Sequence, residues 1–335
     1  MAGKDNEIQE LVNKLREDPD NMNEPWDFET EHHFQREGLP LEKRMFDGYV
    51  LNPTVPNEVY LSGLSYEPDD DDVFICTYPK CGTTWAQMIL FQLMNDGLTP
   101  DQTPNKTMYL ASPTIEFFGS ELCKALVPRP RLIKSHMPYE KLPQSRSNRN
   151  KTVLLTRNPK DALVSFFHHQ RLFACYEFKS GAISDAYVDA FLEGTDFEFG
   201  SYFDYIRGWM PHLQDDNLLH LKYEDMLKDH KGAVLKLANF LGGAAQRMVE
   251  DPQKLQAIID KSSFGSMKAN MKILFPSATV SADADKTQNF VRKGKKGGWR
   301  EALSTEQSRK IDNKFQECFA NTEFEHYWAE QMKTE

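Results

Sequence analysis

Four short runs of apolar or β-branched residues constrain the fold of this 335-residue chain most strongly. Runs of this length are typical of strands that are buried on both faces of a parallel sheet. Helical patterns separate the runs, and strands alternating with helices indicate an α/β fold with a mostly parallel central sheet. The expected strands are 73–77, 131–134, 152–156 and 218–222, and the expected helices include 84–93, 161–173, 187–192 and 232–241.

The two ends of the chain have weaker patterns. Residues 1–72 form an entry segment in which 7–16 are predicted to be helical, and residues 304–329 are predicted to form a closing helix. The acidic run Asp69 to Asp72 is interpreted as a solvated turn rather than a metal site, because contiguous carboxylates usually face water. Residues 269–290 lack periodicity and are predicted to be a long loop, which in a compact domain is often functional.

Composition argues against several classes of protein. Hydrophobic residues make up 40% of the chain, so a large core can be buried and global disorder is not expected. The net charge of −10 argues against general nucleic-acid or acidic-membrane binding, but not against a local basic pocket for one anion. No apolar run reaches the ~20 residues that span a bilayer. The polar start is unlike a signal peptide, and the five scattered cysteines lack metal-ligand spacing, so we expect a cytoplasmic protein with reduced thiols.

Polar residues follow each expected strand, at the edge where open α/β sheets bind ligands. Residues 78–85 lie between the first strand and a helix, whose N-terminus can hold phosphate through unpaired backbone N–H groups. Lys80 precedes Gly82, so the pattern is not the Walker sequence. Taken alone, this motif fits an ordinary threonine-capped turn equally well.

A second basic cluster follows the third strand. Arg157 offers a planar guanidinium that suits a terminal phosphate, Pro159 favours a helix start, and Ser165 lies within that helix. A third cluster, Arg292-Lys293-Gly294, is by itself more typical of a solvated charge run. Two separate anion sites suit a ligand with phosphates at two positions, and no obvious Walker-B aspartate is present to hold magnesium.

His136 follows the second strand and is the best candidate for a general base. The reference pKa of a histidine is about 6.5, so the side chain can accept a proton near neutrality. His136 lies two residues after Lys134, and strand alternation would place both side chains on one face of the sheet. A lone histidine is usually structural, but this position at a strand end favours a catalytic role.

At these residues the chain resembles the cytosolic sulfotransferase family. YPKCGTTW resembles the family's 5′-phosphosulfate loop, KSH its catalytic histidine segment, RNPKDALVS its 3′-phosphate segment, and RKG with Gly298-Trp299 its C-terminal nucleotide motif. The likeness runs from about Met45 to the C-terminus. It implies an N-terminal extension over 1–44 and a single α/β sulfotransferase domain over 45–335, with a phosphate-binding loop that resembles the P-loop.

The resemblance implies transfer of the sulfuryl group of 3′-phosphoadenosine 5′-phosphosulfate (PAPS), without a metal, to a hydroxyl or amine of a small lipophilic acceptor. Such acceptors include phenols, catecholamines and hydroxysteroids. His136 would accept the proton, while Lys80 and Lys134 would stabilise the sulfuryl group. The implied nucleotide contacts are Lys80, Cys81, Gly82, Thr83, Thr84, Trp85, Arg157, Ser165, Tyr223, Ser262, Phe264, Met267, Arg292, Lys293 and Gly294. By position, Phe117, Phe118, His169, Tyr202 and Phe275 are candidates for the acceptor pocket, although each is equally typical of a core residue.

The chain departs from the family pattern in three places. Residues 271–290 match no family pattern, and the usual GDW reads Gly297-Gly298-Trp299. Arg309 stands where the family's dimer signature has a glutamate, so that signature is poorly matched and a homodimer stays an open alternative. Two other functions stay open, a P-loop-like kinase and a non-catalytic module that binds PAPS or its product. The missing Walker features disfavour the first, and the retained histidine and lysines disfavour the second. A membrane-anchored Golgi relative is disfavoured because no N-terminal anchor is evident.

Overall fold

The computed structural model describes residues 2–18, 44–46, 48–52, 55–172, 176, 181–270, 273 and 297–333. Among them, four parallel strands form a central sheet in the order β4-β3-β5-β6. The strands are β3 (Val73–Thr77), β4 (Leu132–Ser135), β5 (Lys151–Thr156) and β6 (Leu218–Lys222), and a separate hairpin pairs β1 (Arg44–Phe46) with β2 (Tyr49–Leu51). The α/β class and the mostly parallel sheet are confirmed, with β4 displaced by one residue from its prediction.

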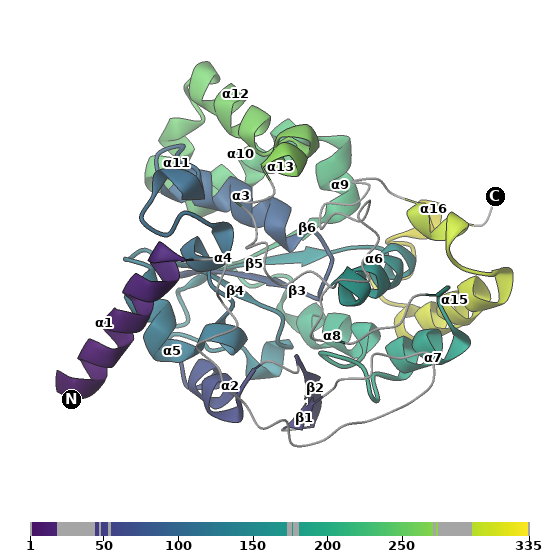
Figure 1. Ribbon diagram of the computed structural model, residues 1–335. Helices are drawn as coiled ribbons and strands as arrows, with labels where there is room; N and C mark the ends of the chain where they lie inside the picture. The colour runs from purple at the N-terminus through teal and green to yellow at the C-terminus, as the bar shows by residue number, and fades with distance from the viewer. Residues whose placement is uncertain are drawn as a thin grey trace.

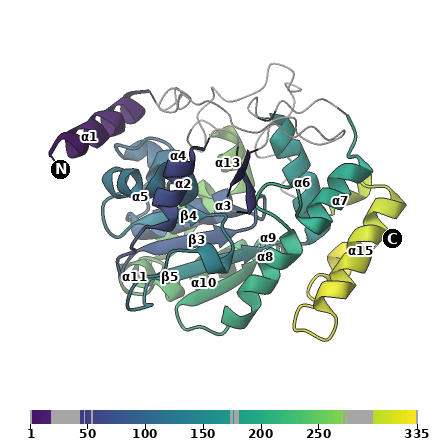
Figure 2. The same ribbon diagram turned by 90° about the horizontal axis from the view of Figure 1, so that it is seen from below.

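Helices cover both faces of the sheet (Figures 1 and 2). Alternation along each strand divides the core: in β3, Phe74 and Cys76 join one buried cluster, whereas Val73 and Ile75 join the other. The first cluster packs with α5, α6 and α8, and the second with α3 and α10. The helices are α1 (Ala2–Glu17), α2 (Asn57–Leu64), α3 (Thr83–Met94), α4 (Met108–Ala111), α5 (Ile115–Leu126), α6 (Pro159–Leu172), α7 (Asp185–Glu193), α8 (Tyr202–Trp209), α9 (Tyr223–Lys228), α10 (His230–Leu241), α11 (Gly243–Met248), α12 (Pro252–Lys261), α13 (Phe264–Ala269), α15 (Thr305–Phe319) and α16 (Ala329–Met332).

The predicted N-terminal helix is present as α1 and packs against α5. Val12 and Leu15 are buried, and Arg16 donates hydrogen bonds to Asn105 Oδ1 (2.9 Å) and to the Leu126 carbonyl (3.1 Å). Within the described ranges, no helix is long and apolar enough to cross a membrane. The four cysteines that the structure describes are free thiols, and Cys175 lies outside the described residues.

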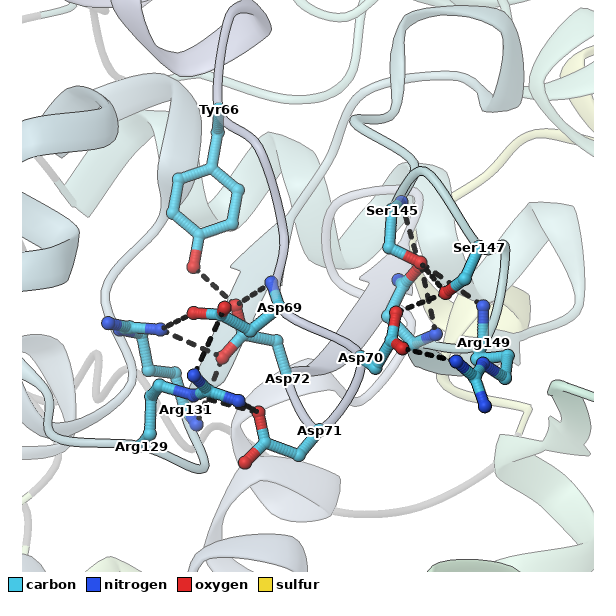
Figure 3. Close-up of polar contacts among 11 residues, drawn as sticks. Tyr66, Asp69, Asp70, Asp71, Asp72, Arg129, Arg131, Ser145, Ser147 and Arg149 are labelled. Atoms are coloured by element: carbon cyan, nitrogen blue, oxygen red, sulfur yellow. Dashed lines mark hydrogen bonds and ion pairs between the residues drawn. The ribbon is translucent and has the colours of Figure 1, made fainter.

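The acidic run lies just before β3, at the amino end of the sheet (Figure 3). Asp70 and Asp71 are exposed, but Asp72 is 0% exposed. Its carboxylate accepts hydrogen bonds from the Tyr66 hydroxyl (2.6 Å) and from Arg131 Nη1 (3.2 Å). The prediction of a solvated turn is therefore wrong for Asp72, because residues on neighbouring segments supply its partners and remove it from water.

The single closing helix predicted for 304–329 is also wrong, because α15 ends at Phe319. Ser304 and Gln307 form a capping box at its start. Asn321 adopts a positive φ of 59°, a conformation that ends helices and that asparagine tolerates. The chain then turns back, so that Phe324 and Trp328 pack into the core before α16 begins.

The start of α6 is tied to the C-terminal part of the chain. Lys160 is 0% exposed, and its ammonium contacts Ser308 Oγ (2.9 Å), the Asp312 carboxylate (2.7 Å) and the Met332 carbonyl (2.7 Å). The next residue, Asp161, accepts hydrogen bonds from the backbone N–H groups of Gly297 (2.7 Å) and Trp299 (3.2 Å). The start of α6, just after Arg157, is therefore held by contacts with α15 and with residues 297–299.

Candidate active site

The turn after β3 leads into the N-terminus of α3, as predicted. Gly82 is the N-cap residue with a φ of 103°, and no side chain caps this twelve-residue helix, so its first N–H groups can bind an anion. A Cβ at Gly82 would lie 2.6 Å from Cδ2 of Tyr223, so the close approach requires glycine. Lys80 has a positive φ of 69°, a strained conformation that is typical of functional loops.

The other residues of this turn pack tightly. Cys81 is buried, and burial raises the pKa of its thiol, which makes it an inert packing residue. The hydroxyl oxygens of Thr77 and Thr83 lie 2.6 Å apart, while Thr84 is half-buried.

His136 lies directly after β4 and is 7% exposed. Its Nδ1 is 2.8 Å from the carbonyl oxygen of Thr77, which can only accept, so Nδ1 carries the proton and Nε2 carries the lone pair. Burial lowers the pKa of His136 well below its usual value, and the charges of Lys134 and Lys80 lower it further. The ordinary histidine pKa assumed from the sequence therefore does not hold, and the imidazole is neutral at neutral pH.

Arg157 lies directly after β5, and its side chain reaches the turn that follows β3. Its Nη1 donates to the Lys80 carbonyl (2.9 Å), and its guanidinium lies 4.4 Å from the centre of the Tyr223 ring. Its Nε is buried without a hydrogen-bond partner among the described residues. Buried donors of this kind are rare and call for an explanation, and an anion here would supply one. Ser165 follows on α6 and is half-buried.

An aromatic cluster lies beside the N-terminus of α3. The Trp85 ring is 5.8 Å from the Tyr223 ring and 5.1 Å from the His230 ring. His230 Nε2 lies 2.9 Å from Ser262 Oγ, which links Ser262 to this cluster, and His230 was not among the predicted site residues. Of the other predicted adenine contacts, Met267 is buried in the core cluster against which Trp85 packs, and Phe264 is 39% exposed at the start of α13.

Glu116 is a site residue that the sequence analysis missed. It belongs to the first turn of α5, is 2% exposed, and its Oε1 accepts the His136 backbone N–H at 2.6 Å. Burial raises the pKa of Glu116 to about 7 and lowers that of Lys134 to about 8, while the charge on each group favours the ionised form of the other. The one signal in the sequence was a lone carboxylate inside the apolar stretch 113–119.

Two predicted acceptor-pocket residues come close to the catalytic candidates. The Phe117 ring stacks 6.4 Å from Phe199, which in turn lies 5.4 Å from the His136 ring, and His169 Nδ1 is 3.4 Å from Lys80 Nζ. Phe199 was not predicted, because its place beside His136 depends on the turn that carries it. The other two described candidates make core contacts: Phe118 packs on Tyr109 at 5.0 Å, and the Tyr202 hydroxyl donates to the Arg157 carbonyl.

Four predicted site residues, Phe275, Arg292, Lys293 and Gly294, lie outside the described residues, as does most of the predicted loop over 269–290. Gly297 and Trp299, which follow them, are bound to Asp161 near Arg157. Within the part of the chain that the structure describes, no group of three or more His, Cys, Asp or Glu side chains is arranged to hold a metal ion. Thr77, Lys80, His136 and Arg157 thus meet at the carboxyl ends of β3, β4 and β5.

Comparison with known proteins identifies one family. A model of the sulfotransferase domain matches residues 70–325. An amine sulfotransferase from rabbit is 34% identical over 272 residues, covering 78% of this chain and 85% of the relative. Human sulfotransferase 2A1 is 34% identical over 255 residues, covering 75% and 85%. The crystal structure of mouse sulfotransferase SULT7A1 complexed with PAP superposes with a TM-score of 0.70 at 27% identity, covering 86% of this chain and 98% of that one.

Proposed function

Because the chain belongs to the sulfotransferase family, we propose that it moves the sulfuryl group of PAPS to a hydroxyl, or an amine, of a small lipophilic acceptor. The observation that carries the proposal is the meeting of the α3 N-terminus, Lys80, Arg157 and an imidazole held through its Nδ1 at one edge of the sheet. The mouse relative bound to PAP, the desulfated product of PAPS, supports this choice of donor.

The residues present fit a nucleotide with phosphates at two positions. The uncapped N-terminus of α3 and the Lys80 ammonium would hold the 5′-phosphosulfate, with Gly82 and Thr83 beside it. The unpaired Nε of Arg157 would bind the 3′-phosphate, with Ser165 on the next helix. The cluster that contains Trp85 would contact the adenine. Arg292, Lys293 and Gly294 remain further candidates for the 3′-phosphate.

His136 is the proposed general base. Its Nδ1–H is bound to the Thr77 carbonyl, which fixes the ring and leaves the Nε2 lone pair to take the acceptor proton. The lysine charges that lower the pKa of His136 would be offset by the anionic donor, which strengthens the base as the complex forms.

The two lysines are proposed to stabilise the transferring group. Lys134, whose pKa is about 8, is mostly protonated at neutral pH. Sulfuryl transfer resembles phosphoryl transfer in needing an in-line acceptor and positive charge around the transferring and leaving groups. The Lys80 ammonium would stabilise the negative charge that develops on the bridging oxygen as the bond between this oxygen and sulfur breaks.

The acceptor is proposed to lie between aromatic rings. Phe117 and Phe199 provide an apolar wall beside His136, which suits a flat or lipophilic alcohol, phenol or amine. The named relatives include an amine sulfotransferase, so both oxygen and nitrogen nucleophiles belong in the test panel.

The test is an assay with ³⁵S-labelled PAPS against a panel of phenols, catecholamines, hydroxysteroids and amines. His136→Ala should lower turnover at least ~100-fold, the low end for a lost general base, while PAP binding is kept. His212→Ala is the matched control, because this histidine ends the short helix Met210–His212 and its ring stacks on Tyr139 at 3.4 Å.

Two results would refute the proposal in different ways. Tight binding of PAP with no transfer to any acceptor would indicate a non-catalytic nucleotide-binding module. Magnesium-dependent turnover of ATP would indicate a kinase. Unchanged turnover of the His136→Ala variant would remove His136 from the mechanism while keeping the reaction.

A further inference from the structure

A second imidazole lies beside the donor-binding loop. His169 is on α6, and its Nδ1 is 3.4 Å from Nζ of Lys80. A lysine ammonium can only donate hydrogen bonds, so Nδ1 of a neutral His169 is the acceptor. This distance is at the long end for a hydrogen bond, and such bonds in active sites often shorten when the substrate complex forms.

We infer that His169 is a positioning residue that holds the Lys80 ammonium in place for sulfuryl transfer. The inference rests on the proposed function, because it assigns a role within the same site. The sequence alone suggested only that His169 lines the acceptor pocket. The contact with Lys80 indicates a different role, in which His169 orients the flexible Lys80 ammonium instead of binding the acceptor.

The contacts of Lys80 support this role at both ends of the residue. Its carbonyl accepts from Arg157 Nη1 (2.9 Å), which fixes the backbone at its unusual positive φ. The lysine side chain is a flexible stem of four methylene groups, and such a stem does not by itself fix the position of the ammonium charge. An acceptor at the far end removes that freedom before the substrates meet, which is how positioned groups accelerate transfer.

The surroundings of His169 keep it neutral and therefore able to accept. Burial lowers its pKa well below the usual value, the charges of Lys80 and Lys134 lower it further, and protonation of His136 would act in the same direction. All three proposed catalytic side chains therefore lie within electrostatic reach of this ring. The helix adds a second relation, because His169 lies four residues after Ser165, on the same side of α6.

The test compares three substitutions that differ in where they present a hydrogen-bond acceptor. His169→Asn places Oδ1 at the position of Nδ1, His169→Gln places its oxygen near the position of Nε2, and His169→Phe keeps a ring without an acceptor. For each variant, kcat, the KM values for PAPS and for the acceptor, and the Kd for PAP would be measured. His168→Phe is the matched control, because the neighbouring ring contacts Phe167 at 5.6 Å.

We expect kcat to fall ~10- to 100-fold in His169→Phe and His169→Gln, the size of effect that misplacing a reacting group produces. His169→Asn should recover most of the loss, and PAP affinity should change little in all three variants. Wild-type kcat in His169→Phe, or equal losses in the Asn and Gln variants, would overturn the inference. Because Asn and Gln are equally polar, their comparison decides the matter even if the Phe variant does not fold. A wild-type protein without transfer activity would instead remove the proposed function, and this inference with it.

Discussion

Replacing Glu116 by glutamine tests how the buried carboxylate controls the charge at the proposed catalytic centre. The amide keeps an oxygen that can accept the His136 backbone N–H, so the strand end stays in place. It removes the negative charge that favours the protonated form of Lys134. The expected result is therefore a change in the pH dependence of turnover rather than a loss of folding.

The sign follows from the charge of Lys134. In the proposed mechanism Lys134 acts as the protonated ammonium, so turnover should fall as pH rises through the pKa of Lys134, which is about 8. Without the Glu116 charge this pKa falls further, because the carboxylate no longer stabilises the ammonium. The kcat of the variant should fall less than ~2-fold at pH 6 to 7 and ~10-fold above pH 8.5, where each unit by which the pKa of Lys134 falls lowers its protonated fraction ~10-fold.

The assay is a kcat profile between pH 5.5 and 9.5 at saturating PAPS and acceptor. Glu198→Gln is the matched control, because Glu198 is also buried with a pKa raised to about 7, yet its hydrogen bonds go to Tyr176 and Gln170. Its alkaline limb should stay where the wild type has it. A Glu116→Gln profile that falls equally at every pH, or keeps the wild-type alkaline limb, would refute the assigned electrostatic coupling.

Two further substitutions test the structure directly. Gly82→Ala adds a Cβ 2.6 Å from the Tyr223 ring, so PAP affinity should fall ~5- to 150-fold in calorimetry, since strain of this kind costs ~1–3 kcal/mol. Gly97→Ala, which has a positive φ but open space, should leave PAP affinity unchanged, and equal effects of the two would contradict the steric argument. Asp72→Asn should lower the free energy of unfolding by ~2 kcal/mol in urea titrations, because it weakens charged, buried hydrogen bonds. The exposed Asp71→Asn should have a smaller effect, and the reverse order would argue against a structural role for Asp72.

The sheet and the strand ends could be predicted from the sequence because each signal is local. The apolar runs of β3 and β6 begin and end where expected, although only β3 is buried along its whole length, because β6 is an edge strand of the sheet. Polar residues directly after a strand must lie at the sheet edge, so Lys80, His136 and Arg157 could be brought together without knowing the intervening helices.

Features that depend on distant partners could not be predicted. The burial of Asp72 depends on Tyr66 and Arg131, and the role of Glu116 depends on its contact with the end of β4. A charge in the sequence carries no sign of such partners, so the default expectation is exposure to water. Likewise, the low pKa of His136 results from burial and from the charges of Lys134 on the preceding strand and of Lys80 on another segment, and a reference value includes none of these.

The buried ammonium of Lys160 has a consequence for how the protein is made. Two of its partners, Asp312 and the Met332 carbonyl, lie 152 and 172 residues further along the chain. While the ribosome is still synthesising those residues, α6 carries a cation that its final surroundings do not yet neutralise, so it cannot settle into its native packing. The start of α6 can therefore complete its native contacts only after residue 332 has been synthesised, although the helix is encoded near the middle of the chain.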